Sequence, residues 1–333
     1  MIGEVAIALS IVIPVYTGAR SIAELVGALQ RLRVPGGREI ILVNDGSQDD
    51  SFEVCRTLLH HPQVPITLIN LTRNFGEHNA VMAGLRVARG EHVITMDDDL
   101  QNPPGEVLRL LEHAQKTGED VVYTYYAEKQ HSLWRNLGSR FANWSVERLL
   151  DKPKGLYLSS FRCMSALVVR QLVRYEGPFP YIDGLILQCT GSIGRLQVEH
   201  LPRAHGRSNY TVRRLVRLWL NIVVNFSVAP LRFATVLGFL MSGAGLVGTV
   251  WVVVEALVSQ TPRGWASLAV AVLLLSGVQL VVLGLLGEYL GRVYLTVNGK
   301  PQSVVREILC SEAVTGQGGP TEHRPGLMSV DPP

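Results

Sequence analysis

Strands and helices alternate along the first 125 residues, and this alternation predicts an α/β fold with a doubly wound, mostly parallel sheet. Short apolar runs mark the strands, and segments with helical spacing separate them. The spacing between successive runs permits the right-handed crossovers that parallel strands require. The expected strands are residues 8–15, 40–43, 66–71, 93–96 and 120–125, and the expected helices are residues 21–32, from about 50, 77–89 and 105–117.

The second half of the chain contains two long apolar runs. Only 18% of all residues are charged and the mean hydropathy is +0.21, which is apolar for a wholly soluble protein. Between Arg232 and Arg263 the single charged residue is Glu255, and none follows until Glu288. Residues 233–256 and 265–288 are each long enough to cross a bilayer as a helix. A buried core helix is the alternative for either run, but two in tandem favour a two-helix transmembrane hairpin.

Basic residues flank the hairpin on one side. Arginines and a lysine precede the first run and follow the second, whereas the linker carries only Arg263. The positive-inside rule therefore predicts a multi-pass protein of the inner (plasma) membrane, with both termini in the cytosol. We expect a cytosolic domain at 1–210, an interfacial amphipathic helix at 211–232, the two spans within 233–289 and a cytosolic tail at 290–333, disordered from about 311.

Charge, the first residues and the cysteines argue against nucleic-acid-binding, secreted and disulfide-linked proteins. The net charge is only +3 and its arginines cluster beside the membrane, so nucleic-acid binding has no support. No secretory signal is expected at residues 1–14, which lack a charged segment and a cleavage site. The four cysteines show no paired spacing and are expected to stay reduced.

Three consecutive carboxylates follow the apolar run at 93–96. Asp97, Asp98 and Asp99 repel one another, and a divalent cation would relieve that repulsion. Carboxylate and amide oxygens, here including Gln101, suit Mg²⁺ or Mn²⁺. The alternative is an ordinary helix N-terminus, because acids before Pro and Gly are common there.

Polar groups also follow two other predicted strands, at 14–16 and 44–47. The carboxyl ends of parallel strands share one edge, where ligands of open α/β sheets bind, so all three segments should meet there. Asp45 could accept hydrogen bonds from a base or a ribose, and Gly46 permits close backbone approach; an ordinary turn is the alternative for this segment. The chain has neither a GxGxxG after the first strand nor a GxxxxGK[ST] motif, so a metal-bridged nucleoside diphosphate fits best.

Taken together, these motifs resemble family 2 glycosyltransferases of the GT-A fold. The resemblance runs from about residue 7 to 308 and is strongest to the polyprenyl-phosphate branch, similar to dolichol-phosphate mannose synthase and bacterial undecaprenyl-phosphate sugar transferases. It is carried by Val-Ile-Pro-Val-Tyr at 12–16, Val-Asn-Asp-Gly-Ser-Gln-Asp-Asp-Ser at 43–51, Arg-Asn-Phe-Gly at 73–76, Asp-Asp-Asp-Leu-Gln-Asn-Pro-Pro at 97–104 and Leu-Gly-Glu-Tyr-Leu-Gly-Arg at 286–292.

The resemblance implies roles for individual residues. The metal ligands would be Asp97, Asp99 and Gln101. The donor site, for a nucleotide sugar, would include Pro14, Tyr16, Asp45, Asp97 and Asp98. The lipid-phosphate site would include Lys129, Arg135, Ser139 and Arg207, and the catalytic residues would be Asp97, Asp99, Arg135 and Ser139.

The acceptor assignment also has a basis in residue spacing. Arg135 and Ser139 lie four residues apart, on one face of an expected helix, and arginine binds phosphate as a bidentate fork. A solvated helical face is the alternative, and for Arg207 the alternative is an arginine at the membrane surface.

Four residues depart from the family pattern. Thr17 and Gly18 stand where relatives have Asn-Glu, so an acidic nucleoside contact is missing, and Asp98 stands where a small residue is common. Ser160 replaces the Asp that is sometimes proposed as the catalytic base. Asp183 is the nearest alternative carboxylate, and we interpret it as a solvated loop acid.

The predicted function is transfer of a sugar, from a UDP-linked donor, to undecaprenyl phosphate at the cytosolic face of the membrane. The reaction would be metal-dependent and inverting, and it would supply a lipid-linked sugar for cell-envelope and lipopolysaccharide modification. The resemblance suggests a homo-oligomer. One alternative is a processive polysaccharide synthase, but the chain lacks the Gln-x-x-Arg-Trp motif and further spans. The other is a non-catalytic membrane scaffold, which the acid cluster argues against and Ser160 favours.

Overall fold

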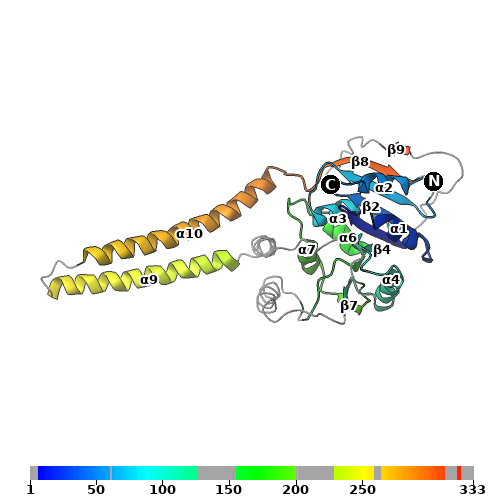
Figure 1. Cartoon of the computed structure of the whole chain (residues 1–333). Coiled ribbons are helices and arrows are strands. Elements are labelled where there is room, and N and C mark those ends of the chain that lie inside the picture. Colours follow the sequence, from blue (N-terminus) through cyan, green and yellow to red (C-terminus); the bar gives the residue numbers. More distant parts are fainter. Residues whose placement is uncertain are drawn as a thin grey trace. The chain divides into compact units, whose positions relative to one another are not determined.

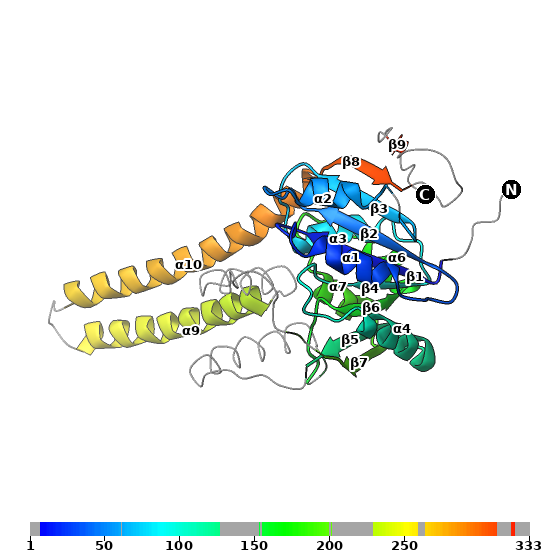
Figure 2. The ribbon, with the colours of Figure 1, turned by 45° about the vertical axis from the view of Figure 1, so that its right-hand side comes forward.

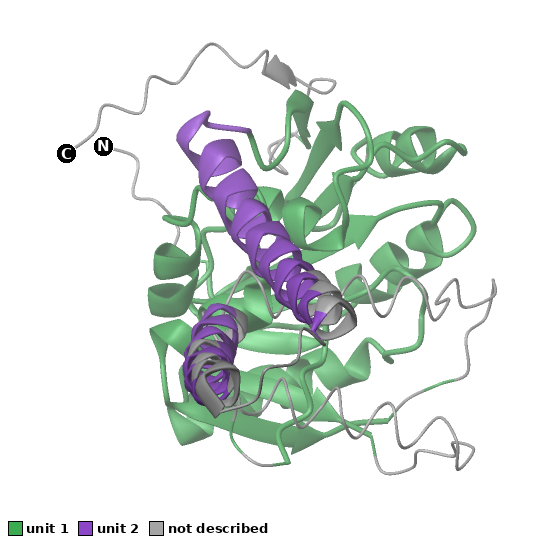
Figure 3. Ribbon diagram, turned by 90° about the vertical axis from the view of Figure 1, so that its left-hand side faces the viewer, with its two compact units in different colours: residues 1–210, 301–333 green, residues 211–300 purple. Residues whose placement is uncertain are grey.

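The computed structural model describes residues 7–60, 62–126, 153, 155–199, 201, 229–258, 264–311 and 321–323. The chain divides into two compact units, shown in different colours in Figure 3. The first combines residues 1–210 with 301–333, and the second comprises residues 211–300. The expected interfacial helix at 211–232 lies outside the described residues up to 228.

The described residues of the first unit form one nine-stranded sheet with the order β7-β5-β6-β4-β1-β2-β3-β8-β9 (Figures 1 and 2). Its centre is parallel: β1 pairs with β2 and β4, and β2 pairs with β3. The predicted mostly parallel α/β fold is confirmed. The strands are β1 (Leu9–Val15), β2 (Arg38–Asn44), β3 (Ile66–Leu71), β4 (His92–Thr95), β5 (Val121–Tyr125), β6 (Arg162–Ser165), β7 (Ile193–Gln197), β8 (Val305–Cys310) and β9 (Thr321–His323).

Helices cover both faces of this sheet. They are α1 (Ile22–Gln30), α2 (Ser51–Thr57), α3 (Glu77–Leu85), α4 (Gly105–Thr117), α6 (Ala166–Leu172) and α7 (Ile182–Cys189). Helices α1, α2 and α4 share one apolar core with alternate residues of β1, such as Ile11 and Ile13. Helix α3 packs on the other face, where a Cβ at Gly84 would lie 2.4 Å from Val12 Cγ1. Glycine at this position therefore lets α3 lie directly on β1 and β2.

The parallel order ends at β4, which differs from the sequence-based expectation for residues 120–125. Strand β6 inserts antiparallel between β4 and β5, and β5 then pairs in parallel with β7. Strand β6 has only four residues and begins with an arginine, so it is too short and too polar at its start to be predicted as a strand.

The segment expected to be a tail at 290–333 is partly a strand of the sheet. Residues 305–310 form β8, which pairs antiparallel with β3, and Thr321–His323 forms β9 beside it. Helix α10 continues past the expected boundary at 290 to Val297, and the residues from Pro301 onward belong to the first unit. The first unit is therefore discontinuous in sequence.

The second unit contains two long apolar helices, α9 (Ala229–Val258) and α10 (Trp265–Val297). Among the described residues both are long and apolar enough to cross a membrane. Large apolar side chains such as Phe239, Trp251 and Leu280 are exposed on them. These helices contain the expected spans at 233–256 and 265–288.

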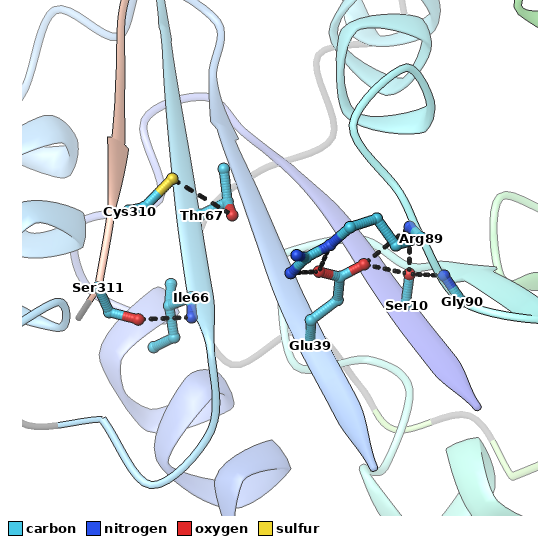
Figure 4. A network of polar contacts seen from close by, with 8 residues as sticks. All are labelled: Ser10, Glu39, Ile66, Thr67, Arg89, Gly90, Cys310 and Ser311. Carbon is cyan, nitrogen blue, oxygen red and sulfur yellow. Dashed lines mark hydrogen bonds and ion pairs between the residues drawn. The ribbon is translucent and has the colours of Figure 1, made fainter. Parts of the chain in front are cut away.

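The amino ends of the central strands are closed by a polar network (Figure 4). Glu39, which is 1% exposed, accepts hydrogen bonds from the Ser10 hydroxyl at 2.7 Å and from the Arg89 guanidinium at 2.7 and 3.1 Å. The Ser10 hydroxyl in turn accepts the backbone N–H of Gly90. These polar groups hydrogen-bond to one another, so the amino ends of the central strands have a structural role. Ligands of open α/β sheets bind at the carboxyl ends of the strands, and the site is therefore expected there.

Candidate active site

The carboxyl ends of β1, β2 and β4 meet at one edge of the sheet, as the sequence predicts. The backbone N–H of Asp45 donates to the Val15 carbonyl at 2.9 Å, and that of Thr17 donates to Ser47 Oγ at 3.2 Å. Asp98 accepts the backbone N–H of Tyr16, which joins the end of β4 to the end of β1. Tyr16 itself is 46% exposed, so its ring is available to a ligand at this edge.

Local backbone strain marks the same edge. Among the described residues, the non-glycine residues with positive φ are Thr17 at 55° and Leu100 at 61°. One follows β1 and the other lies in the acidic segment after β4. Such conformations cost of order 1 kcal/mol or more each and concentrate at functional sites.

Asp45 holds a loop rather than reaching out from the strand end. It is 2% exposed, and its two carboxylate oxygens accept the backbone N–H groups of Phe75 and Gly76 at 2.7 and 2.9 Å. Burial raises the pKa of Asp45, while these two hydrogen bonds oppose the rise. Gly46 has a φ of +61°, and a Cβ there would lie 2.3 Å from the Arg73 carbonyl carbon. Both residues therefore fix the position of the 73–76 loop beside the site.

The acids after β4 are held by polar partners. Ser160 Oγ donates to Asp97 Oδ2 at 2.7 Å, and the backbone N–H of Gln101 donates to Asp99 Oδ1 at 3.2 Å. The Gln101 side-chain nitrogen donates to the Leu201 carbonyl at 3.3 Å, so its amide oxygen is the atom it could offer to a cation. Sequence reasoning identified Ser160 only as a departure; the structure makes it the partner of an expected metal ligand.

Asp98 occupies the space between the ends of β1 and β4. Its Oδ2 atom is buried and has no hydrogen-bond partner among the described residues. Burial, followed by the charges of Asp97 and Asp99, raises the pKa of Asp98 to about 7, although the Tyr16 backbone hydrogen bond opposes the rise. An ideal Cβ on Gly18 would lie 2.0 Å from this Oδ2 atom. Asp98 in its present position therefore requires glycine at residue 18.

These residues fit a divalent cation that is shared with a ligand. The described residues contain no group of three or more His, Cys, Asp or Glu side chains that could hold a metal ion by themselves. Mg²⁺, however, is usually bound by one or two carboxylates together with substrate phosphates and water. The carboxylates of Asp97 and Asp99 and the Gln101 amide oxygen supply such a partial set. Burial is the main cause of the raised pKa of Asp98, and the charges of Asp97 and Asp99, which a cation would offset, add to it.

A buried charged network lies beneath the acids. Arg162, 2% exposed, forms an ion pair with Asp183, and the Tyr123 hydroxyl donates to the same carboxylate at 2.8 Å. Burial disfavours the charged guanidinium, but Asp183 and Tyr123 outweigh it and raise the pKa of Arg162. Arg162 Nε donates to Thr95 Oγ1 at 3.3 Å, and Thr95 Oγ1 donates to the Ser160 carbonyl at 2.6 Å. The network therefore supports the residue that contacts Asp97.

The interpretation of Asp183 as a solvated loop acid is wrong. It lies in the first turn of α7 and is 7% exposed, because Arg162 and Tyr123 neutralise and bond its carboxylate. An arginine between Phe161 and Cys163, in an otherwise apolar stretch, was the signal that a buried acid should exist elsewhere.

The expected lipid-phosphate residues Lys129, Arg135, Ser139 and Arg207 lie outside the described residues. Pro14 is the penultimate residue of β1, close to the edge that carries Tyr16.

The acidic segment and the loops that follow β1 and β2 lie together at one edge of the sheet, and comparison with known proteins identifies the class of this protein. Residues 10–174 match the glycosyl transferase family 2, and residues 229–293 match the GtrB C-terminal hairpin. The chain belongs to glycosyl transferase family 2 and is a glycosyltransferase. The hairpin match covers most of α9 and α10 and agrees with the predicted two-helix arrangement.

The curated relatives cover nearly the whole chain. An undecaprenyl-phosphate 4-deoxy-4-formamido-L-arabinose transferase of Pseudomonas aeruginosa (strain LESB58) is 35% identical over 305 residues, which is 90% of either chain. The transferase of the same name from Yersinia enterocolitica serotype O:8 is 34% identical over 310 residues, or 91% of this chain and 94% of the relative. Among solved structures, M. tuberculosis glucosyl-3-phosphoglycerate synthase is 18% identical with a TM-score of 0.49, covering 65% of this chain and 78% of that one.

Proposed function

We propose that this glycosyltransferase moves a sugar from a nucleoside-diphosphate sugar, UDP-linked, to undecaprenyl phosphate at the cytosolic face of the inner membrane. The observation that carries the proposal is the acidic segment at the carboxyl end of β4, where Ser160 orients Asp97 and the backbone of Gln101 orients Asp99. The names of the relatives support the lipid acceptor. Their sugar, 4-deoxy-4-formamido-L-arabinose, is the first donor to test.

On this proposal, the sheet edge binds the donor. Tyr16 offers an exposed ring for the base, and Asp45 maintains the loop at 73–76 that borders the nucleoside. Asp97, Asp99 and Gln101 would hold Mg²⁺ or Mn²⁺ together with the diphosphate. When bound, the ion neutralises the charge that develops on the departing diphosphate.

The acceptor needs positioning more than deprotonation. The second pKa of a phosphate monoester is about 6, so the lipid phosphate is largely dianionic at neutral pH. This removes the requirement for a carboxylate base at residue 160, where Ser160 instead donates its proton in a hydrogen bond to Asp97. We assign the lipid phosphate to Arg135 and Ser139, with Lys129 and Arg207 as further contacts, and a single in-line displacement would invert the anomeric carbon.

The two apolar helices would place this chemistry at the membrane. We propose that both cross the bilayer and that both chain termini are cytosolic, since the basic residues flank the pair on one side. Cysteine labelling in intact cells tests this: a cysteine introduced at Ser259, in the linker, should react with an impermeant maleimide from outside, and native Cys310 should not.

The decisive experiment is a transfer assay with the full chain in detergent. It contains undecaprenyl phosphate, Mg²⁺ or Mn²⁺ and a panel of UDP- and GDP-linked sugars, and the lipid product is identified by mass. We expect one sugar-phosphate lipid that disappears with EDTA and in Asp99→Asn, whereas the control Glu112→Gln, an exposed residue of α4, retains activity. Product formation that persists in EDTA would refute the metal assignment, and nucleotide release without a lipid product would refute the acceptor.

A further inference from the structure

The segment that follows α10 is built into the catalytic domain at several points. Gln302 is 5% exposed; it accepts a hydrogen bond from the Arg86 guanidinium at 2.7 Å and donates to the carbonyls of Tyr175 and Gly177. At the far end of β8, Ser311 Oγ accepts the Ile66 backbone N–H at 2.8 Å, as Figure 4 shows. Between these anchors, β8 runs antiparallel along β3.

Three side chains lie opposite one another across the ends of β2, β3 and β8. The strand register pairs Asn44 with Asn70, and Asn70 with Glu307. Asn44 Nδ2 donates to Asn70 Oδ1 at 2.9 Å, and Asn70 Nδ2 donates to Glu307 Oε1 at 2.9 Å. The two asparagines are 3% and 8% exposed, so water does not readily replace either bond.

Glu307 sets the direction of this line of hydrogen bonds. A carboxylate accepts and does not donate, so it selects the NH₂ group of Asn70 and turns the Asn70 oxygen toward Asn44. Asn44 therefore presents its NH₂ group to Asn70 and its oxygen to the backbone N–H of Ser47, which donates to it at 3.3 Å. Reversal of either amide would place two donors against each other inside the domain.

The line ends in the loop that carries the donor-side residues. Ser47 Oγ accepts the backbone N–H of Thr17 at 3.2 Å and donates to the Val15 carbonyl at 3.4 Å. Glu307 is thus connected, through two buried amides, to the loops that follow β2 and β1. Asp45 and Tyr16 lie in those loops.

We propose that Glu307, in the strand that returns from the membrane hairpin, is a positioning residue for the donor site and fixes the Asn44–Ser47 loop through Asn70 and Asn44. This inference rests on the proposed function only for the identity of the ligand, a nucleoside diphosphate. It makes the segment after the second apolar helix a component of donor binding rather than a tail.

The test compares three substitutions of Glu307 in the full chain. Glu307→Gln keeps an oxygen acceptor and should behave like the wild type. Glu307→Ala removes the acceptor, and Glu307→Lys replaces it with a donor, so both should loosen the Ser47 amide. The control is Cys310→Ala, on the same strand but near Thr67, at the other end of β3 (Figure 4).

Two readouts are required. Hydrogen exchange at residues 44–48 should be faster in Glu307→Ala and Glu307→Lys, but not in Glu307→Gln or Cys310→Ala. The Kd for UDP, measured by calorimetry with Mg²⁺, should rise about fivefold in Glu307→Ala, as expected for one lost hydrogen bond, and more in Glu307→Lys. The KM for undecaprenyl phosphate should not change.

The outcomes separate this inference from the proposed function. If exchange at 44–48 and the Kd for UDP are unchanged in both Glu307→Ala and Glu307→Lys, the positioning role is refuted. A uniform loss of thermal stability with unchanged Kd in the folded protein also refutes it. If the wild type binds neither UDP nor GDP, the proposed function fails, and the exchange data alone decide whether Glu307 fixes the loop.

Discussion

The ion pair between Arg162 and Asp183 permits a quantitative prediction, because both groups are buried and each is the ion-pair partner of the other. Asp183→Asn preserves the shape of the side chain and removes only its charge. The buried guanidinium of Arg162 then keeps a neutral acceptor and loses its counter-ion. Removal of one partner of a buried pair costs about 3–5 kcal/mol, and retention of the Asn oxygen places this variant near the lower end. For a domain of this size about 3 kcal/mol lowers Tm by roughly 6–12 °C.

The assay is thermal unfolding of the detergent-purified chain at one fixed scan rate. Glu112→Gln, which removes an exposed acid on α4, is the matched control and should change Tm by about 1 °C or less. Arg162→Met and the double variant complete a thermodynamic cycle, and the double variant should be less destabilised than the sum of the single variants. A Tm for Asp183→Asn within about 1 °C of the wild type would show that Asp183 is solvated, and would refute the network.

Two further substitutions probe the acids at the site. Ser160→Ala removes the hydroxyl that donates to Asp97 at 2.7 Å, so kcat/KM should fall about tenfold, the effect of one hydrogen bond to a charged group. Ser160→Thr keeps a hydroxyl and should restore activity. An unchanged kcat/KM in Ser160→Ala would contradict the positioning role of Ser160. Gly18→Ala places a methyl group 2.0 Å from Asp98 Oδ2 and should raise the Kd for the donor nucleotide severalfold. The double variant Gly18→Ala/Asp98→Ala should lack the clash between these two side chains, so its Kd should rise by less than the two single effects together. Additivity of the two single effects would contradict the steric explanation.

The local hydrophobic pattern of the sequence was sufficient to predict the strands and helices of the parallel half of the sheet. The expected strand at 66–71 and the expected helix at 105–117 agree with β3 and α4 residue for residue, because each has an uninterrupted pattern bounded by turn residues. The convergence of Asp45 and Asp97 at one edge followed from the rule that parallel strands align their carboxyl ends. These features depend on neighbours in sequence and on the topology of the sheet.

The remaining features depend on partners distant in sequence. Strand β8 pairs with β3 across more than 230 residues, so the six residues Val305–Cys310 carry no local sign of the sheet that they join. Asp183 is buried because Arg162 and Tyr123 are present on other elements, and a single carboxylate before a glycine looks the same in a solvated loop. A charged side chain is buried only where an opposite charge and hydrogen-bond partners accompany it, so the sequence around one member of such a pair does not reveal its burial.

The two departures from the family pattern at residues 18 and 98 have one structural explanation. The pattern that this chain resembles has Glu after the first strand and a small residue between the two acids, whereas this chain has Gly18 and Asp98. In the structure the Asp98 carboxylate fills the space where a side chain on residue 18 would begin, and it accepts the Tyr16 backbone N–H. Asp98 therefore places a carboxylate between the ends of β1 and β4. A side chain at residue 18 would collide with Asp98 in its present position, so the two residues are sterically coupled. Gly18 and Asp98 thus fit each other at the edge that we propose binds the donor, and this fit argues against the scaffold alternative.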